Sequence, residues 1–352
     1  MRSIRMIAIW TTLALLIGML SGCMPQQDEE TPTVPTAPDG TVITTTAAAA
    51  PEAVWQNPIT GREDMNGSTS DRPVGIMIAN NDFMQGEQVG ICDADMWMET
   101  ETEAGITRIM AVFANTERVP SAIGPIRSAR SPFVHVVDAL DIAYAHAGGS
   151  YPALSLLSYV DGVGNIDLDD SGAGDYCWRD EDYPHDYEFR LRTSGEKLTN
   201  YMQDHDYSMQ ALRDIPWTHG TPTGKACGHV QIRMSDAQII SFEYDSASGS
   251  YNKYNGYSET RHSDINGKPL QTENVLILYT DRYNETDATI DFYLENGTGY
   301  VFSGGLTRRF EWSRGDDGFT MTEEDGSPLT LATGRVYLCV VGAHFEDELT
   351  IG

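Results

Sequence analysis

Basic residues are scarce in this sequence. Its 352 residues include 23 lysines and arginines against 52 aspartates and glutamates, which gives a formal net charge of −29 at pH 7. Because a strongly acidic protein repels the phosphate backbone of nucleic acids, this balance argues against a nucleic-acid partner. The acidity can also serve only to keep an extracellular protein soluble, so by itself it identifies no ligand.

The sequence also lacks the common signatures of metal and cofactor sites. Its five cysteines include no Cys-x-x-Cys pair and no cysteine–histidine cluster with the spacing of a zinc site. It contains no Gly-x-Ser-x-Gly elbow, no P-loop, no His-Glu-x-x-His and no dinucleotide fingerprint. We therefore expect no metal and no cofactor, and the absence of these motifs argues against the common enzyme classes.

One long apolar run lies at the N-terminus. Arg2 and Arg5 precede residues 6–20, a run too short for a comfortable transmembrane helix. It closes on Leu-Ser-Gly-Cys23, the form of a bacterial lipobox, in which the cysteine is diacylated and becomes the mature N-terminus. We predict a signal peptide over 1–22 and a lipid anchor on Cys23 that holds the protein on the extracytoplasmic face of the cell membrane. A cleaved secretory signal with an incidental cysteine is the alternative.

The remaining cysteines would then lie in a compartment that permits disulfides. Four cysteines allow three pairings, and the sequence does not choose among them. Each could instead be a small buried residue, and one of two could be a catalytic thiol, Cys177 or Cys227. The four are Cys92, Cys177, Cys227 and Cys339.

Composition and periodicity divide the chain into segments. Residues 23–54 are rich in Thr, Pro, Ala and acids, which predicts a disordered tether. Over 55–215 strand-like and helix-like segments alternate, whereas 216–352 shows a period of two between Asn-Gly, Asp-Gly and Ser-Gly turns. We predict an α+β protein with an N-terminal α/β domain, whose sheet is mixed and partly parallel, and a C-terminal, mainly antiparallel β domain.

The N-terminal domain gives the clearest local predictions. We expect strands over 72–78, 94–102, 106–115 and 142–147 and three helices, over 131–140, from 152 onward and over 193–206. Ser131 and Ser150 are the expected N-caps of the first two helices, and Thr193 opens a capping box for the third.

Two arginines stand at or just before the first predicted helix. The positive end of the helix dipole disfavours Arg127 and Arg130 there, so a negative group should compensate. It can be a carboxylate, phosphate or sulfate ligand held by guanidinium groups and free helix N–H groups. It can also be the protein's own acids, the alternative that the sequence favours. Asp95, Glu99 and Glu103, spaced by four, form a negative stripe that could face solvent, hold a bound cation, or pair with these arginines or with Arg108.

A second turn of the same strand-to-helix form runs from His146 to Ser150. Its paired glycines let the backbone approach a ligand, and successive N–H groups can form an anion-binding concavity. In a parallel pair of strands, both turns would lie at one sheet edge, where α/β folds bind ligands. His146 could be a general base or a hydrogen-bonded structural residue.

A third candidate is the loop with Trp178, Arg179 and, further on, His185 beside Asp186. It suits binding or acid–base chemistry, or it is pinned to the core by Trp178 and Tyr187. The expected ligand-binding residues are Arg108, Arg127, Ser128, Arg130, His146, Gly148, Gly149, Ser150, Trp178 and Arg179. The catalytic candidates are Asp95, Glu99, His146 and His185.

The run of motifs resembles the YerB-like family of bacterial lipoproteins. The matching stretches are 55–61, 72–80, Asp95 with Glu99 and Glu103, 105–108, 123–130, 146–150, Pro184-His185, 254–278 with His262, Asp264 and Asn274, and 297–340. The resemblance implies a two-part domain of unknown function, with an α/β N-terminal part and a β-rich C-terminal part. Asp186 stands where the family usually has Asn, and the four cysteines after Cys23 lie outside its pattern, which suggests disulfides peculiar to this branch.

These observations favour a membrane-anchored lipoprotein that binds an anionic envelope component, such as a phosphorylated glycan or wall precursor. One alternative is an envelope enzyme of phosphoryl or glycosyl transfer that uses the same arginines. Another is a protein-interaction scaffold without a small ligand. The alternatives separate on whether Asp95 and Glu99 reach the arginine turn across an open cleft or whether all four groups form a closed network.

Overall fold

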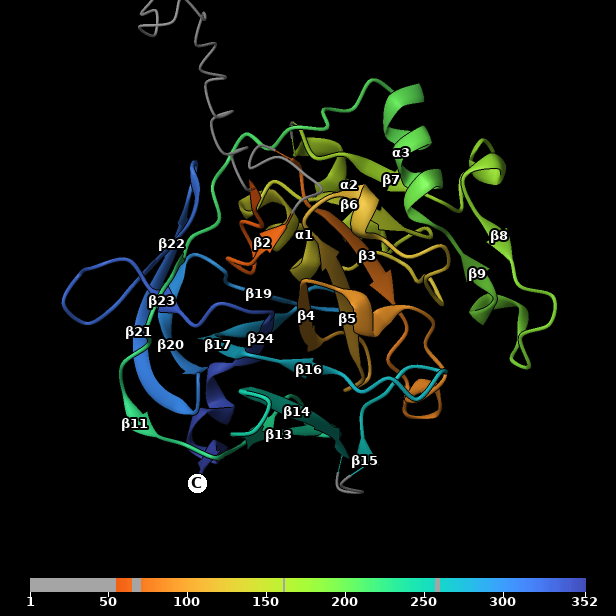
Figure 1. The fold of residues 1–352 in the computed structure, drawn as a ribbon. Helices are drawn as coiled ribbons and strands as arrows, with labels where there is room; N and C mark the ends of the chain where they lie inside the picture. Colours follow the sequence, from red (N-terminus) through yellow and green to blue (C-terminus); the bar gives the residue numbers. More distant parts are fainter. Residues whose placement is uncertain (1–54, 65–70, 161, 257–259) are drawn as a thin grey trace, which may run out of the picture. The chain divides into compact units, whose positions relative to one another are not determined.

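The computed structural model describes residues 55–64, 71–160, 162–256 and 260–352, and these described residues form one compact unit (Figure 1). The predictions for the signal peptide 1–22, the lipid anchor on Cys23 and the tether 23–54 fall outside the described residues. Among the helices of the described part, none is both long and apolar enough to cross a membrane.

A central sheet of eleven strands organises the fold. Its order is β11 (Lys225–Ala226), β21 (Leu306–Gly315), β20 (Asn296–Ser303), β17 (Asn274–Thr280), β24 (Val336–Gly342), β4 (Met96–Glu101), β5 (Thr107–Phe113), β3 (Val74–Ile78), β6 (Ala143–His146) and β7 (Asn165–Asp167), with β22 (Gly318–Thr322) beside β21. The pairs β17–β24, β24–β4, β3–β6 and β6–β7 are parallel, and the other pairs are antiparallel. The predicted mixed α+β fold is confirmed.

A second, antiparallel sheet and several short strand pairs complete the β structure. The second sheet has the order β15 (Thr260–Arg261), β14 (Ser250–Asn255), β13 (Ile239–Asp245), β12 (His229–Arg233) and β25 (Thr350–Ile351), with β16 (Gln271–Thr272) beside β14. The short pairs are β1 (Trp55–Gln56) with β2 (Glu63–Asp64), β8 (Trp178–Arg179) with β9 (Leu191–Arg192), β10 (Thr218–His219) with β23 (Thr330–Leu331), and β18 (Arg282–Asn284) with β19 (Ile290–Phe292).

Both faces of the central sheet are covered, which explains its nearly continuous apolar strands. On one face Ile76 and Ile277 pack with Phe242 of the second sheet and with the helix α3 (Gly195–Asp204). On the other face Met77 and Leu276 pack with the helices α1 (Ser131–Ala139) and α2 (Tyr151–Tyr159). In Figure 1, α1 lies above the central strands, and β13 and β14 lie below them.

The helix caps follow the predictions only in part. Ser150 caps α2 as expected, since its Oγ accepts the Ala153 N–H at 3.4 Å. Ser131 is not the cap of α1, because Arg130 is the last extended residue and the Ser131 Oγ donates to Glu285 at 2.6 Å instead. Ser194, rather than Thr193, caps α3 by accepting the Lys197 N–H.

Strands from both sides of the predicted boundary at 215/216 share the central sheet. β24 of the C-terminal half lies parallel to β4 of the N-terminal half, with Val336 opposite Met96 and Val340 opposite Thr100. β24 therefore pairs the edge of β4 that the N-terminal strands would leave open, and each half completes the sheet of the other.

The four cysteines after Cys23 are free thiols, so the expected disulfides are wrong. Three are buried and Cys177 is partly exposed, which fits the alternative of small core residues. Burial raises the pKa of the Cys177 and Cys227 thiols, and it raises the pKa of Cys92 to about 12. Because the nucleophile is the thiolate, these surroundings do not support a catalytic thiol.

Candidate functional site

The two predicted turns lie side by side. The Arg127 N–H donates to Met77 of β3, and the Arg127 C=O accepts from Ala147 at 3.0 Å. Two residues on, Ala129 bridges Gly149 in parallel fashion. The structure therefore brings the arginine turn and the His146 to Ser150 turn together beside the ends of β3 and β6.

Arg108 and Arg130 share one carboxylate. Arg130 holds Glu103 with both fork nitrogens, at 2.7 and 2.8 Å, and the Arg108 Nη2 lies 2.5 Å from the Glu103 Oε1. Burial raises the pKa of Glu103, but the Arg130 hydrogen bond and the two positive charges outweigh it and lower the pKa overall. Burial and the Arg130 charge lower the pKa of Arg108 to about 10. Of the two alternatives for these two arginines, the internal ion pair is the one formed.

Arg127 has a more exposed partner. Its Nη1 lies 2.8 Å from a carboxylate oxygen of Glu188, and the Glu188 side chain is 59% exposed. The guanidinium group stacks over Phe189, 4.7 Å from the ring centroid. A second arginine from the predicted set is arranged in the same way, because Arg179 stacks over Tyr187 at 3.8 Å and faces Asp169 across 3.8 Å.

These two arginines line one small cavity of about 190 Å³, which we call the arginine hollow. Ser128 and Ala147 of the two turns line it as well, and Asp169 and Glu188 stand at it with side chains that are 58% and 59% exposed. The volume suits one tetrahedral or planar anionic group. Two guanidinium groups, each lying over an aromatic ring, can present paired N–H donors to such a group.

The polar groups of the His146 to Ser150 turn form hydrogen bonds within the protein. His146 is buried, with Nδ1 at 2.8 Å from the Gly148 carbonyl oxygen and Nε2 at 2.7 Å from the Asn165 Oδ1. The Gly148 N–H donates to Asp167 and the Ser150 N–H to Ala129. With both ring nitrogens occupied, His146 fits its structural alternative rather than a general base.

Asp95 and Glu99 lie away from the arginine hollow. Both oxygens of Asp95 are held by Arg118, at 2.7 Å each, and Asp95 also accepts the Ala114 N–H. Glu99 belongs to a buried polar cluster, in which it accepts from Asn80, Thr107 and Tyr337 and lies 3.4 Å from the Lys253 Nζ.

Sequence reasoning missed the partners of this cluster. Lys253 is fully buried on β14, between Tyr251 and Asn255 of the same face, and His262 joins it at 3.2 Å. The alternation of side chains along β14 could have predicted this burial. In a strand with Tyr251 facing inward, Lys253 and Asn255 also point inward.

The last two candidates, His185 and Trp178, lie close in sequence to the residues that line the arginine hollow but are not among them. His185 lies 3.6 Å from Glu87 and packs against the ring of Tyr183. Trp178 lies 6.0 Å below the Lys197 ammonium group. Within the described ranges, no two of Asp95, Glu99, His146 and His185 contact each other, and no group of three His, Cys, Asp or Glu side chains is arranged to hold a metal ion.

Two family models match consecutive parts of the chain. Residues 59–208 match the N-terminal domain of the protein of unknown function DUF3048, and residues 230–338 match its C-terminal domain. The chain belongs to the DUF3048 family. The predicted resemblance is therefore confirmed, and the interval between the two models contains the predicted boundary at 215/216.

Within this family, the chain is similar to a protein described as "Putative lipoprotein YerB" from Bacillus subtilis (strain 168). The two are 25% identical over 297 residues, which cover 81% of this chain and 85% of that protein. The crystal structure of the B. subtilis YerB protein superimposes with a TM-score of 0.71 and 23% identity, over 84% of this chain and 98% of that one. The fold is thus shared across nearly the whole relative.

Proposed function

We propose that this DUF3048 protein is a lipid-anchored protein of the extracytoplasmic membrane face that binds an anionic group of an envelope component in the arginine hollow. A phosphorylated glycan or wall precursor fits this role. The observation that carries the proposal is the convergence of Arg127 and Arg179, from separate segments, on one cavity of about 190 Å³. Support for the anchor comes from the lipobox at Cys23 and from the similarity to a protein named as a lipoprotein.

Arg127 and Arg179 differ from Arg108 and Arg130 in the solvent exposure of the acids that they pair with. Exposed ion pairs contribute about 0–1 kcal/mol, so a ligand anion can replace Glu188 and Asp169 at little cost. Glu103 is only 25% exposed and accepts two guanidinium groups, so displacing it would leave buried charge unpaired. The anion would therefore bind at the hollow and not at Glu103.

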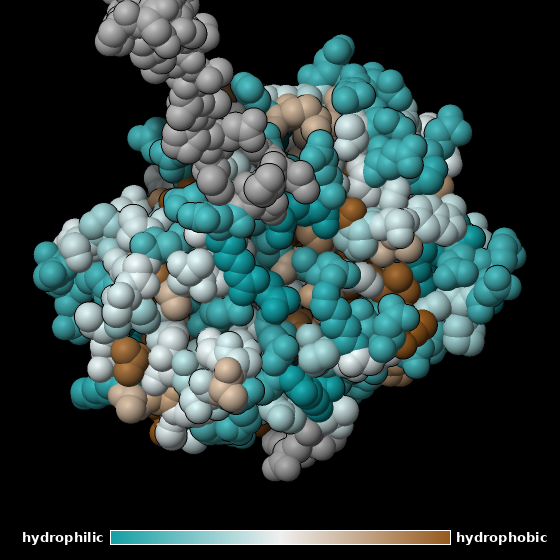
Figure 2. Space-filling model, viewed as in Figure 1, coloured by the Kyte–Doolittle hydropathy of each residue, from teal (hydrophilic) through white to brown (hydrophobic). Residues whose placement is uncertain are grey.

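Exposed aromatic rings beside the hollow suit an uncharged body on the ligand. Tyr187, which stacks on Arg179, is 68% exposed, and Phe83, which packs edge-on against Phe189, is 54% exposed. Such rings offer flat apolar faces to a sugar. Elsewhere, the face shown in Figure 2 is largely hydrophilic or neutral, with apolar surface in small patches.

The alternatives have less support. An enzyme of phosphoryl or glycosyl transfer needs an acid within reach of the anion, and the acids at the hollow are Asp169 and Glu188 rather than Asp95 and Glu99. A scaffold without a ligand fits the closed pairing of Glu103. It gives no role to Arg127 and Arg179, each of which lies over an aromatic ring at the hollow.

The test is calorimetric titration of the chain from residue 24 onward, produced without acylation, with a sugar phosphate, a sugar sulfate and the neutral sugar. We expect the two anionic sugars to bind and the neutral sugar to bind at least tenfold more weakly. Arg127→Gln with Arg179→Gln should abolish the difference.

The matched control is Arg233→Gln. Arg233 also stacks on a ring, Phe345 at 5.6 Å, and pairs with an exposed acid, Glu348 at 3.4 Å, but it lies outside the hollow. Binding that survives the double substitution, or that Arg233→Gln removes equally, contradicts the proposal.

A further inference from the structure

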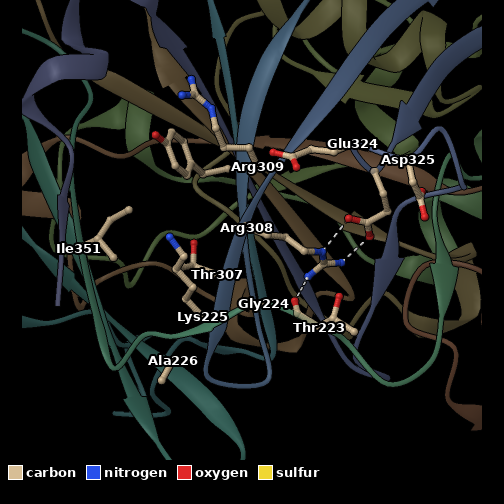
Figure 3. A pocket seen from close by; sticks show the side chains of 12 residues that line it. Thr223, Gly224, Lys225, Ala226, Thr307, Arg308, Arg309, Glu324, Asp325 and Ile351 are labelled. Atoms are coloured by element: carbon tan, nitrogen blue, oxygen red, sulfur yellow. Dashed lines mark hydrogen bonds and ion pairs between the residues drawn. The ribbon is translucent and has the colours of Figure 1, made fainter.

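A second cavity, larger than the arginine hollow, lies away from it at the outer edge of the central sheet. It measures about 770 Å³ and is lined by segments 223–226, 307–309 and 323–325 together with Tyr300 and Ile351 (Figure 3). A cavity of this size accommodates a ligand of several residues or rings. None of its residues is among the site residues predicted from the sequence.

The sheet edge inside this cavity is incomplete. β11 pairs with Leu306 and Thr307 of β21, whereas β22 pairs with β21 only from Glu311 onward. In the described part of the chain, no strand therefore pairs with Arg308, Arg309 or Phe310 on this edge.

Alternation fixes which main-chain groups point into the gap. The Gly305 C=O faces this edge, because it accepts the Cys227 N–H at 2.9 Å. In an antiparallel strand the N–H and C=O of every second residue point to the same edge, so those of Thr307, Arg309 and Glu311 share it. Thr307 and Glu311 have partner strands, whereas the N–H and C=O of Arg309 meet no strand among the described residues and are free to pair.

Some charged side chains around the gap have ion-pair partners and others do not. Arg308 is neutralised by Glu323 through two 2.7 Å contacts, and Arg309 pairs with Glu346 while stacking over Tyr300. By contrast, Lys225 and Glu324 form no ion pair or side-chain hydrogen bond with any described residue. In the view of Figure 3, Lys225 and Asp325 lie on opposite sides of Arg308, and Glu324 lies above it.

We propose that this cavity binds a short, extended peptide with a free carboxylate terminus. One peptide residue pairs with the free N–H and C=O of Arg309 as an added strand, as in other sheet-edge recognition. Its carboxylate meets Lys225, its ammonium group faces Glu324 and Asp325, and an apolar side chain packs against Ile351. A polyanion is disfavoured because the acidic loop 323–325 would repel it.

This inference is independent of the arginine hollow. Its test uses the unacylated chain from residue 24 onward and the probe peptide tri-alanine, with nuclear magnetic resonance detection of the Arg309 amide. We expect tri-alanine to shift this amide in a saturable way. The peptide with an amidated C-terminus, and the Lys225→Gln variant with tri-alanine, should each bind at least fivefold more weakly.

Two further variants control for indirect effects. Lys268→Gln removes another partly exposed lysine, which pairs with Asp93, and should leave tri-alanine binding unchanged. Arg309→Pro removes the outward N–H while leaving the ladder to β20 intact, and should bind less than Arg309→Ala when both are followed at the Phe310 amide. The proposal is overturned if tri-alanine leaves the Arg309 amide unmoved at 20-fold molar excess over about 1 mM protein, or if Lys225→Gln binds as the parent does.

Discussion

The Lys253 Nζ lies 3.4 Å from the Glu99 Oε2, and neither side chain has exposed surface. Lys253 comes from β14 of the second sheet and Glu99 from β4 of the central sheet, so the ion pair joins the two sheets. Three further donors, Asn80, Thr107 and Tyr337, satisfy the carboxylate. A buried charge pair of this kind is costly to break, because the remaining charge has no water to replace its partner.

We expect Lys253→Met to destabilise the protein by about 3–5 kcal/mol, because it leaves the Glu99 carboxylate buried without a counter-charge. Urea denaturation at pH 7 measures the loss. The double variant Lys253→Met with Glu99→Gln removes both charges and should recover at least 1 kcal/mol, on the order of one charge-assisted hydrogen bond. A double variant no more stable than Lys253→Met would contradict this view of the pair.

Acid should weaken the protein through His262. Burial and then the Lys253 charge hold the pKa of His262 well below 6.5. The unfolded chain therefore binds a proton below pH 6.5 that the folded protein does not, so stability falls as pH falls, by about 1.4 kcal/mol per unit for one such histidine.

Urea midpoints at pH 7, 6 and 5 test this dependence. His262→Gln should lower stability at pH 7, because Gln88 and Lys253 each lose a hydrogen-bond partner, but it should give a shallower pH slope. His219, whose pKa burial also lowers, keeps part of the slope in both proteins. An unchanged slope in His262→Gln would assign the acid sensitivity to other groups.

The two acids that meet the predicted arginines should differ in their effect on stability. Glu103→Gln leaves Arg108 and Arg130 without their shared counter-charge and should cost about 3 kcal/mol, as for other buried pairs. Glu188→Gln should cost less than about 1 kcal/mol, since its pair with Arg127 is exposed. Denaturant unfolding compares the two variants, and equal losses would contradict the distinction between them.

The free thiols give a chemical prediction. The protein unfolded in denaturant without reductant should show four reactive thiols from Cys92, Cys177, Cys227 and Cys339, and reductant should leave the melting temperature unchanged. In the native protein Cys177 should react first with a thiol reagent, because it alone is partly exposed. Cys92 should react slowly, because burial raises its pKa to about 12. Peptide mapping by mass spectrometry follows each site, and fewer than four reactive thiols in the unfolded, unreduced protein would reveal a disulfide.

Local sequence patterns determined most of the elements. The apolar runs predicted β3, β4, β5 and β6 to within a few residues, because a strand buried on both faces requires such runs. Ser150 was recognisable as a cap because its hydrogen bond spans only three residues. The family resemblance could also be recognised from the sequence, because it is carried by short motifs of neighbouring residues.

The pairing of charges was decided only by the tertiary structure. Spacing placed Asp95, Glu99 and Glu103 on one stripe, but each found a different partner: Arg118, the buried Lys253, and the pair Arg108 with Arg130. The sequence alone determined which acids and arginines needed partners. Only the packing of β24 beside β4, and of β14 beneath them, decided which were buried, because those contacts join residues more than a hundred positions apart whose register no local pattern specifies.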